Sequence, residues 1–289
     1  MNYDFPLYRP PSESRSLILQ ITLGCSHNKC TFCYMYKTKK YRMKTSSEIE
    51  EHIRWAKEEY PNAKRIFLAD GNVLAIDTPV LKDIVKRLYE EFSELERVTA
   101  YAGPKDILAK SDIELLELRN AGLTMLYLGV ESGSAQVLKN VKKGVSPEEM
   151  IQAGQRVIKA GFKLSCMVIS GLGGKEHWEE HAIESARVIS EIDPHYFALL
   201  TLLVEQGTLL YAQVKKGEFK LLEPQEVIEE TKLMLKNIEL TECTFRSNHP
   251  SNYVNLKGVL NNDKEKLLDI LTKAQENKDN FTPEGWRGL

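Results

Sequence analysis

Three cysteines stand close together near the start of the chain, in the segment Cys25-Ser-His-Asn-Lys-Cys30-Thr-Phe-Cys33. This C-x4-C-x2-C spacing places three thiolates on one tight loop, which is typical of a metal or cluster site. Three thiolates can bind three irons of a [4Fe–4S] cluster, which usually takes four, so one iron would stay open for a ligand. A zinc ion with His27 as fourth ligand is one alternative, and buried thiols without a ligand are another.

Glycine-bearing segments follow three other short apolar runs. They are Asp70-Gly71-Asn72, Gly129–Ser134 and Ser170–Gly174. Glycines at such positions let the backbone approach a ligand closely and leave N–H and C=O groups accessible. Because the carboxyl ends of strands carry the chemistry in α/β folds, we expect these segments and the cysteine loop on one rim.

The elements that must position these residues alternate between short apolar runs and longer helical stretches. The runs are nearly continuous in apolar residues, as in parallel strands covered on both faces. They span 17–22, 65–69, 98–102, 125–130, 164–170 and 196–203. The helices between them begin near Ser46, Asp77, Ser111, Ser146 and Glu176, and two further helices are expected at 224–239 and 264–276. Six strand–helix units predict an α/β fold with a parallel sheet.

The composition excludes several classes of protein. The 289 residues include 39 Lys and Arg against 41 Asp and Glu, and the net charge of −2 argues against a strongly basic nucleic-acid footprint. No apolar run approaches the length of a transmembrane helix, and the first residues lack the pattern of a signal peptide. Five cysteines, an odd number, do not suit a secreted disulfide framework. We therefore expect a cytoplasmic protein.

Taken in order, the cysteine loop, Asp70-Gly71-Asn72, GVESGS and GLGG resemble the radical S-adenosylmethionine (SAM) superfamily over residues 16–205. The first cysteine gap is one residue longer than the family's common C-x3-C-x2-C, as it is in several subfamilies. The resemblance implies a partial (β/α)6 TIM-like barrel at 16–205. An N-terminal arm at 1–15 would precede it, and a C-terminal helical or irregular extension at 206–289 would cover the substrate cavity.

The resemblance also implies roles for individual residues. Cys25, Cys30 and Cys33 would bind three irons, and Phe32 would lie against the adenine of SAM. Lys143 would pair with the methionine carboxylate of SAM, with Arg156 as the competing candidate because a guanidinium is the better carboxylate fork. The other SAM contacts implied at matching positions are Asp70, Gly71, Asn72, Glu131, Ser132, Val168, Ile169 and Gly171.

The activity implied by the resemblance is reductive cleavage of SAM at a [4Fe–4S] cluster. Cleavage leaves methionine and a 5′-deoxyadenosyl radical that abstracts hydrogen from a small polar substrate, while the protein orients the reactants and excludes water. The expected partners are a small-molecule substrate and a flavodoxin- or ferredoxin-type electron donor. We expect neither a membrane nor a nucleic acid as a partner.

Several polar side chains are candidates for contacts with that substrate. They are Tyr34, Tyr36, Glu205, Asn248, His249, Asn252 and Tyr253. Such groups suit a guanine-like edge and a diol. With one cluster and the longer cysteine gap, the sequence is similar to queuine lyases, so queuine in a lyase reaction of modified-base salvage is the favoured substrate.

Two alternatives stay open. A coproporphyrinogen-oxidase-like or RNA-modifying relative would favour more clustered Arg and Lys near the site. A non-catalytic zinc- or cluster-binding module would carry no radical chemistry at all.

Overall fold

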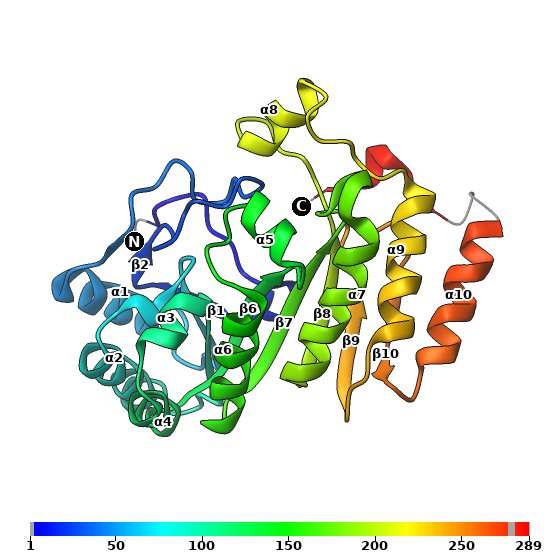
Figure 1. Cartoon of the computed structure of the whole chain (residues 1–289). Coiled ribbons are helices and arrows are strands. Elements are labelled where there is room, and N and C mark those ends of the chain that lie inside the picture. Colours follow the sequence, from blue (N-terminus) through cyan, green and yellow to red (C-terminus); the bar gives the residue numbers. More distant parts are fainter. Residues whose placement is uncertain (1–2, 277–280, 289) are drawn as a thin grey trace. The chain divides into compact units, whose positions relative to one another are not determined.

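The computed structural model describes residues 3–276 and 281–288 (Figure 1). No helix among them is long and apolar enough to cross a membrane. The chain forms two compact units: the first holds residues 1–28, 33–128 and 156–164, and the second holds 29–32, 129–155 and 165–289. The expected boundaries, with an arm at 1–15 and an extension from residue 206, stay a prediction.

Four parallel strands form the sheet of the first unit. β1 (Leu17–Gln20) pairs with β4 (Arg65–Ala69), β4 pairs with β5 (Arg97–Tyr101), and β5 pairs with β6 (Leu123–Glu131). β4 and β5 are buried along almost their whole length, as their continuous apolar runs predict. The last residues of β6, from Gly129 on, belong to the second unit.

Capping signals begin and end the helices of the first unit close to the predicted positions. α1 (Ser46–Glu59) and α4 (Asp112–Ala121) each begin with a capping box. Gly122 ends α4 with a left-handed φ of 114°, which glycine adopts without steric cost. α2 (Thr78–Glu91) carries a proline in its first turn and contacts α4. The short helix α3 (Pro104–Ala109) was not expected.

The second unit also contains four strands. β7 (Lys163–Ser170), β8 (Tyr196–Thr201) and β9 (Cys243–Ser247) run parallel, and β10 (Leu256–Leu260) pairs antiparallel with β9. The sequence predicted an irregular polar segment where β9 and β10 lie, because neither strand has a continuous apolar run. The expected α/β fold with a parallel sheet is confirmed: among the described residues the main sheet has eight strands, where six were expected, and within each unit its strands all run parallel except β10.

One face of the second unit's sheet is buried and the other is half-exposed. Residues of β7 alternate between buried and half-buried, and β8 and β9 alternate in the same way. Figure 1 shows α7 (Gly174–Ile192), α9 (Pro224–Asn237) and α10 (Lys264–Glu276) side by side along these strands. The prediction of burial on both faces is therefore wrong for β7 and β8.

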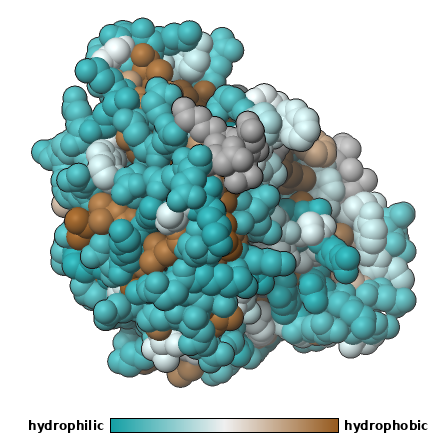
Figure 2. All heavy atoms as spheres, turned by 90° about the vertical axis from the view of Figure 1, so that its right-hand side faces the viewer, coloured by the Kyte–Doolittle hydropathy of each residue, from teal (hydrophilic) through white to brown (hydrophobic). Residues whose placement is uncertain are grey.

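The remaining helices of the second unit are α5 (Ala135–Asn140), α8 (Leu209–Lys215) and most of α6 (Pro147–Lys159). Figure 2 shows that the side of the molecule seen at the right of Figure 1 is mainly hydrophilic. The exposed residues of α10, such as Glu265 and Lys266, contribute to this character.

Gly133 brings the segment after β6 into direct contact with α7. Its N–H donates a hydrogen bond to Ser185 Oγ at 2.8 Å, and a Cβ at this position would overlap the backbone carbonyl of Glu184. A side chain therefore cannot be accommodated without moving helix backbone, which is why this position of the GVESGS stretch requires glycine.

We predict that Gly133→Ala lowers the free energy of unfolding by about 1–3 kcal/mol, since overpacking against backbone forces a shift of that size. Urea denaturation measures the change. Gly285→Ala is the matched control, because a Cβ there meets nothing within 4 Å. Equal unfolding midpoints for the two variants would show that Gly133 does not contribute to this packing.

Candidate functional site

The cysteine loop is held at both ends by one buried carboxylate. Asp70 is fully buried at the end of β4, and its Oδ2 accepts hydrogen bonds from the N–H of Gly24 at 2.9 Å and from Lys39 Nζ at 3.0 Å. Gln20 Nε2 donates to Oδ1 at 3.0 Å. Burial raises the pKa of Asp70, and these bonds act in the opposite direction. Asp70 thus has a positioning role, while its contact with SAM stays a prediction.

The N-terminal arm is tied to the same buried ion pair. Lys39 Nζ lies 3.1 Å from Asp4 Oδ1 and donates to the carbonyls of Asp4 and Pro6. The strands β2 (Thr22–Leu23) and β3 (Arg42–Met43) pair antiparallel, so the loop leaves and returns at one place. These contacts fix the base of the loop.

All five cysteines in the described part of the chain are thiols rather than disulfides; those at 166 and 243 are buried, and the three of the loop are half-buried. No three His, Cys, Asp or Glu side chains of the described residues lie close enough to hold a single metal ion. Cys25 packs near Tyr36, because a Cβ on Gly71 would lie 3.0 Å from Cys25 Cβ and 2.6 Å from Tyr36 Cε2.

The Tyr36 hydroxyl is buried and has no hydrogen-bond partner among the described residues. The three thiols of the loop are the ligands that an iron–sulfur cluster takes. The Tyr36 hydroxyl near Cys25 is a buried donor that a sulfur could satisfy. The residues present therefore fit a [4Fe–4S] cluster. Tyr36, a predicted substrate contact, is buried at this place, and its contact with substrate stays a prediction.

Asn72 joins the end of β4 to the residue that follows Cys25. Its Nδ2 donates to Ser26 Oγ at 2.6 Å and to Asp106 Oδ2, and its Oδ1 accepts from the N–H of Gly103 at 3.0 Å. Ser26 also donates to Asp106 at 3.2 Å. Asp106 is not among the predicted site residues, because it lies on the unexpected helix α3 and no motif marks it.

Two of the predicted SAM contacts bind each other in the second unit. Glu131 Oε1 accepts a hydrogen bond from Lys143 Nζ at 2.9 Å, and both side chains are largely buried. Glu131 has a φ of 66°, which is unusual for a residue with a side chain. A Cβ on Gly129 would overlap Glu131 Oε1, so the glycine leaves room for this ion pair.

Arg156, the competing candidate for the SAM carboxylate, binds the end of α3 in the first unit. Its Nη1 donates to the carbonyl of Leu108 at 3.2 Å, and its Nη2 donates to that of Lys110. Its Nε donates to Asp112 Oδ1 at 2.8 Å. Cations commonly satisfy the last carbonyls of a helix in this way. Whether Lys143 or Arg156 binds the SAM carboxylate stays a prediction.

A chain of buried polar side chains connects three segments of the second unit. His181 on α7 is fully buried; its Nδ1 lies 2.8 Å from Ser132 Oγ, and its Nε2 lies 3.1 Å from the carbonyl of Ile169. The carbonyl can only accept, so Nε2 carries the proton and Ser132 donates to Nδ1. Burial lowers the pKa of His181 to about 4, so the ring is neutral. The predicted SAM contact Ser132 therefore also joins β6 to α7.

Glu230 on α9 completes this chain. Its Oε1 accepts from the N–H of Gly171 at 2.7 Å and lies 3.8 Å from His181 Nε2, while its Oε2 has no partner among the described residues. Burial raises the pKa of Glu230 to about 8. The sequence showed no link between Glu230 and the GLGG stretch, because the two lie far apart along the chain.

The predicted adenine contacts on β7 point to opposite faces of the sheet. Val168 is on the buried face and Ile169 is on the half-exposed face, because successive side chains alternate along a strand. Ile169 and Phe32 pack against the same apolar cluster. The structure thus brings Phe32 and Ile169 together and directs Val168 into the core.

The predicted substrate contacts after β9 have different surroundings. Asn252 is buried: its Oδ1 accepts from Thr201 Oγ1 at 3.0 Å, and its Nδ2 donates to the carbonyl of Leu199 at 2.9 Å. The Tyr253 ring is stacked by the Arg287 guanidinium at 3.9 Å. Asn252 and Tyr253 therefore hold protein together in this structure. The other candidates are more accessible: Tyr34, Glu205 and His249 are half-buried, and Asn248 is exposed.

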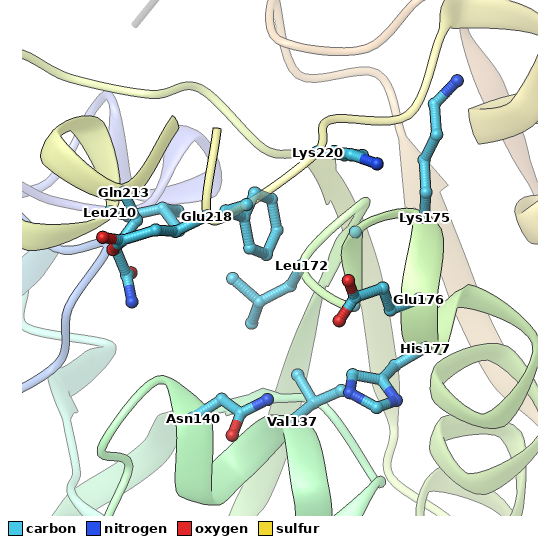
Figure 3. Close-up of a pocket in the computed structure, with 13 residues that line it drawn as sticks. Val137, Asn140, Leu172, Lys175, Glu176, His177, Leu210, Gln213, Glu218 and Lys220 are labelled. Atoms are coloured by element: carbon cyan, nitrogen blue, oxygen red, sulfur yellow. The ribbon is translucent and has the colours of Figure 1, made fainter. Parts of the chain in front are cut away.

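A cavity of about 260 Å³ lies in the second unit between α5, the start of α7 and α8 (Figure 3). Its floor is apolar, and polar side chains surround it. Figure 3 shows Asn140 from α5 and Glu176 from α7 pointing toward it. No sequence motif marks Asn140 or Glu176 as part of a cavity, because the two come from separate segments.

Comparison with known proteins gives a family match and several relatives. The family model described as Radical SAM superfamily matches residues 19–186. The heme chaperone HemW of Bacillus subtilis is 24% identical over 230 residues, which cover 74% of this chain and 58% of that protein. The tRNA uridine(34) acetyltransferase of Methanocaldococcus infernus is 31% identical over 120 residues, 41% of this chain and 22% of that protein.

Among solved structures, coproporphyrinogen III oxidase (HemN) from Escherichia coli has a similar fold. It superposes with a TM-score of 0.57 at 17% sequence identity, covering 76% of this chain and 52% of that chain. The chain thus spans less than two thirds of the length of each of these three proteins.

We predict that the buried Glu230 makes the stability of the protein decline between about pH 4.5 and pH 8. The folded state keeps a proton up to a pKa of about 8, whereas the unfolded state loses it near 4.5. The folded state therefore binds more protons in this window, and the free energy of unfolding falls by up to about 1.4 kcal/mol per pH unit.

Urea denaturation at several pH values checks this for the wild type and Glu230→Gln. The variant keeps an acceptor for Gly171, does not titrate, and should gain stability over the wild type as pH rises from 5 to 8. Glu229→Gln, an exposed neighbour, is the control and should follow the wild type. Parallel curves for Glu230→Gln and wild type would contradict the prediction.

Proposed function

Because the chain belongs to the radical SAM superfamily, we propose that it cleaves SAM reductively at a [4Fe–4S] cluster bound by Cys25, Cys30 and Cys33. The cluster and SAM are the cofactors of this family. When bound there and reduced, the cluster would supply one electron for cleavage of SAM into methionine and a 5′-deoxyadenosyl radical, which would remove hydrogen from a carbon of the substrate. The observation that supports this most is the cysteine loop whose two ends bind the buried Asp70.

The roles of the chain's own residues follow from their contacts. Lys143, held by Glu131, would bind the methionine carboxylate, and Asn72 would order the segment that receives the amine. Phe32 and Ile169 would form an apolar surface for adenine. A flavodoxin- or ferredoxin-type protein would deliver the electron, and a cytoplasmic location would keep the cysteines reduced.

Queuine, cleaved in a lyase reaction of modified-base salvage, is the first substrate we propose. The accessible polar groups of Asn248 and His249 suit its guanine-like edge and its diol. Asn252 and Tyr253 would shape that segment through their contacts with protein rather than with substrate.

A pair of cations favours a second class of substrate that carries carboxylates or phosphates. Arg246 on β9 and Lys257 on β10 are directly opposite each other and both are exposed. Like charges in this position destabilise a strand pair, and a bound anion would relieve the repulsion. Clustered cations are what a coproporphyrinogen-like or RNA substrate requires, and the names of relatives include a heme chaperone and a tRNA-modifying enzyme.

Anaerobic reconstitution with iron and sulfide tests the activity. The wild type should bind about four irons and convert SAM to 5′-deoxyadenosine when reduced. Alanine at Cys25, Cys30 or Cys33 should reduce this product to background, whereas Cys166→Ala, a change at a buried thiol, should retain it. Circular dichroism verifies that all variants fold. Bound zinc with intact SAM would instead support a non-catalytic binding module.

The rate of 5′-deoxyadenosine formation, measured with and without a candidate compound, tests the identity of the substrate. The compounds are queuine, coproporphyrinogen III and bulk tRNA. Stimulation by queuine supports the first proposal. Stimulation by an anionic compound that is lost in a double Arg246→Gln, Lys257→Gln variant supports the second class.

Lys143→Met should raise the Kd for SAM at least about tenfold while cluster content is unchanged, because a charge-assisted contact with the carboxylate is lost. Arg156→Met should instead lower the free energy of unfolding and leave the Kd of the folded fraction unchanged. Calorimetric titration with SAM and urea denaturation measure the two effects. The reverse pattern would assign the carboxylate to Arg156.

A further inference from the structure

Tyr36 carries a buried hydroxyl that the protein itself does not satisfy. The side chain is 3% exposed, and its hydroxyl has no hydrogen-bond partner among the described residues. A buried donor without a partner is costly, and native structures rarely keep one unless something else binds it. The contrast is Tyr127, another buried phenol of the first unit, which donates to Glu13 Oε1 at 2.6 Å.

The position of Tyr36 is fixed from several sides. Asn28 Nδ2 donates to the carbonyl of Tyr36 at 2.8 Å. The ring of Tyr8 packs edge-on at 5.6 Å, and Lys39 Nζ lies 5.9 Å from the centre of the Tyr36 ring. Gly71 leaves room for Tyr36 Cε2, the carbon next to the one that bears the hydroxyl. The hydroxyl therefore cannot turn to another partner without loss of these contacts.

Part of the cysteine loop lies close to the Tyr36 ring. A Cβ on Gly71 would lie 2.6 Å from Tyr36 Cε2 and 3.0 Å from Cys25 Cβ, so both side chains border Gly71. Burial raises the pKa of Tyr36, and Tyr101, Asp70, Cys25 and Cys33 add to this effect. Whatever lies beside it, a phenol hydroxyl can donate one hydrogen bond.

We propose that the Tyr36 hydroxyl donates a hydrogen bond to a sulfur of the cluster, either a cysteine thiolate or a bridging sulfide, and so sets the reduction potential of the cluster. The proposal rests on the proposed function, since it requires the cluster. Hydrogen bonds to sulfur stabilise the more negative reduced form and raise the potential. Tyr36 is therefore a positioning and tuning residue rather than a contact with substrate.

The test compares Tyr36→Phe with the wild type after reconstitution without SAM. Redox titration followed by electron paramagnetic resonance should give a more negative midpoint potential for the variant at equal iron content. In heavy water, pulsed electron paramagnetic resonance of the reduced cluster should show one fewer coupling to an exchangeable deuteron in Tyr36→Phe than in the wild type. Without the cluster, Tyr36→Phe should unfold at the same or a higher urea concentration, because only an unsatisfied hydroxyl is removed.

Tyr127→Phe is the matched control, since it removes a buried phenol that has a protein partner. It should lower the stability and leave the potential unchanged. An unchanged potential and deuteron coupling in Tyr36→Phe would overturn the proposal while cluster and SAM cleavage still stand. A raised Kd for SAM with an unchanged potential would also overturn it, because the donor would then bind SAM. If the wild type assembled no cluster, the proposed function itself would fail.

Discussion

The buried ion pair between Asp70 and Lys39 is the interaction on which the cysteine loop depends. Each charge is removed from water, so each must be matched by partners inside the protein. Asp70 obtains them from Gly24, Gln20 and Lys39, and Lys39 obtains further acceptors from the N-terminal arm. Gly24 directly precedes Cys25, and Lys39 follows the loop. The groups that neutralise the buried carboxylate of Asp70 are therefore also the groups that hold the two ends of the loop.

The second unit joins its strand ends by a different principle. His181 and Glu230 are as deeply buried as Asp70, yet neither has a full counter-charge, and burial shifts both pKa values toward the neutral forms. Neutral hydrogen bonds then connect Ser132, Ile169 and Gly171 to α7 and α9. Glu230 Oε2 has no partner among the residues that the structure describes, and an unpaired polar atom is costly in a low-dielectric interior.

The residues proposed to contact the cofactors lie at ordered strand ends, whereas the candidates for substrate contacts are dispersed. The segments proposed to contact the cofactors are the ends of β4, β6 and β7, and each is ordered by bonds to buried side chains. The substrate candidates are dispersed: Asn252 is used to bind Thr201, while the cation pair and the cavity lie elsewhere in the second unit. Chemistry shared by a superfamily resides in the common segments, whereas substrate choice resides in parts that vary.

Local patterns in the sequence determined the cysteine loop, the glycine segments and the elements between them. Continuous apolar runs and capping residues act over a few positions, so β4, β5, α1 and α4 could be predicted with nearly correct ends. The hairpin of β9 and β10 could not, because β9 is stabilised by pairing with β8, and β10 by pairing with β9, rather than by their own composition.

Only the tertiary structure decided which polar side chains meet. From the sequence, Arg156 and Lys143 are both candidates for the SAM carboxylate. In the structure Arg156 binds the last carbonyls of α3, whereas Lys143 binds Glu131. Asp106, His181, Glu230 and the Arg246–Lys257 pair have partners distant along the chain, and nothing in a local pattern encodes a distance across the fold. The same holds for Tyr36, whose missing partner is visible only once every neighbour of its hydroxyl is known.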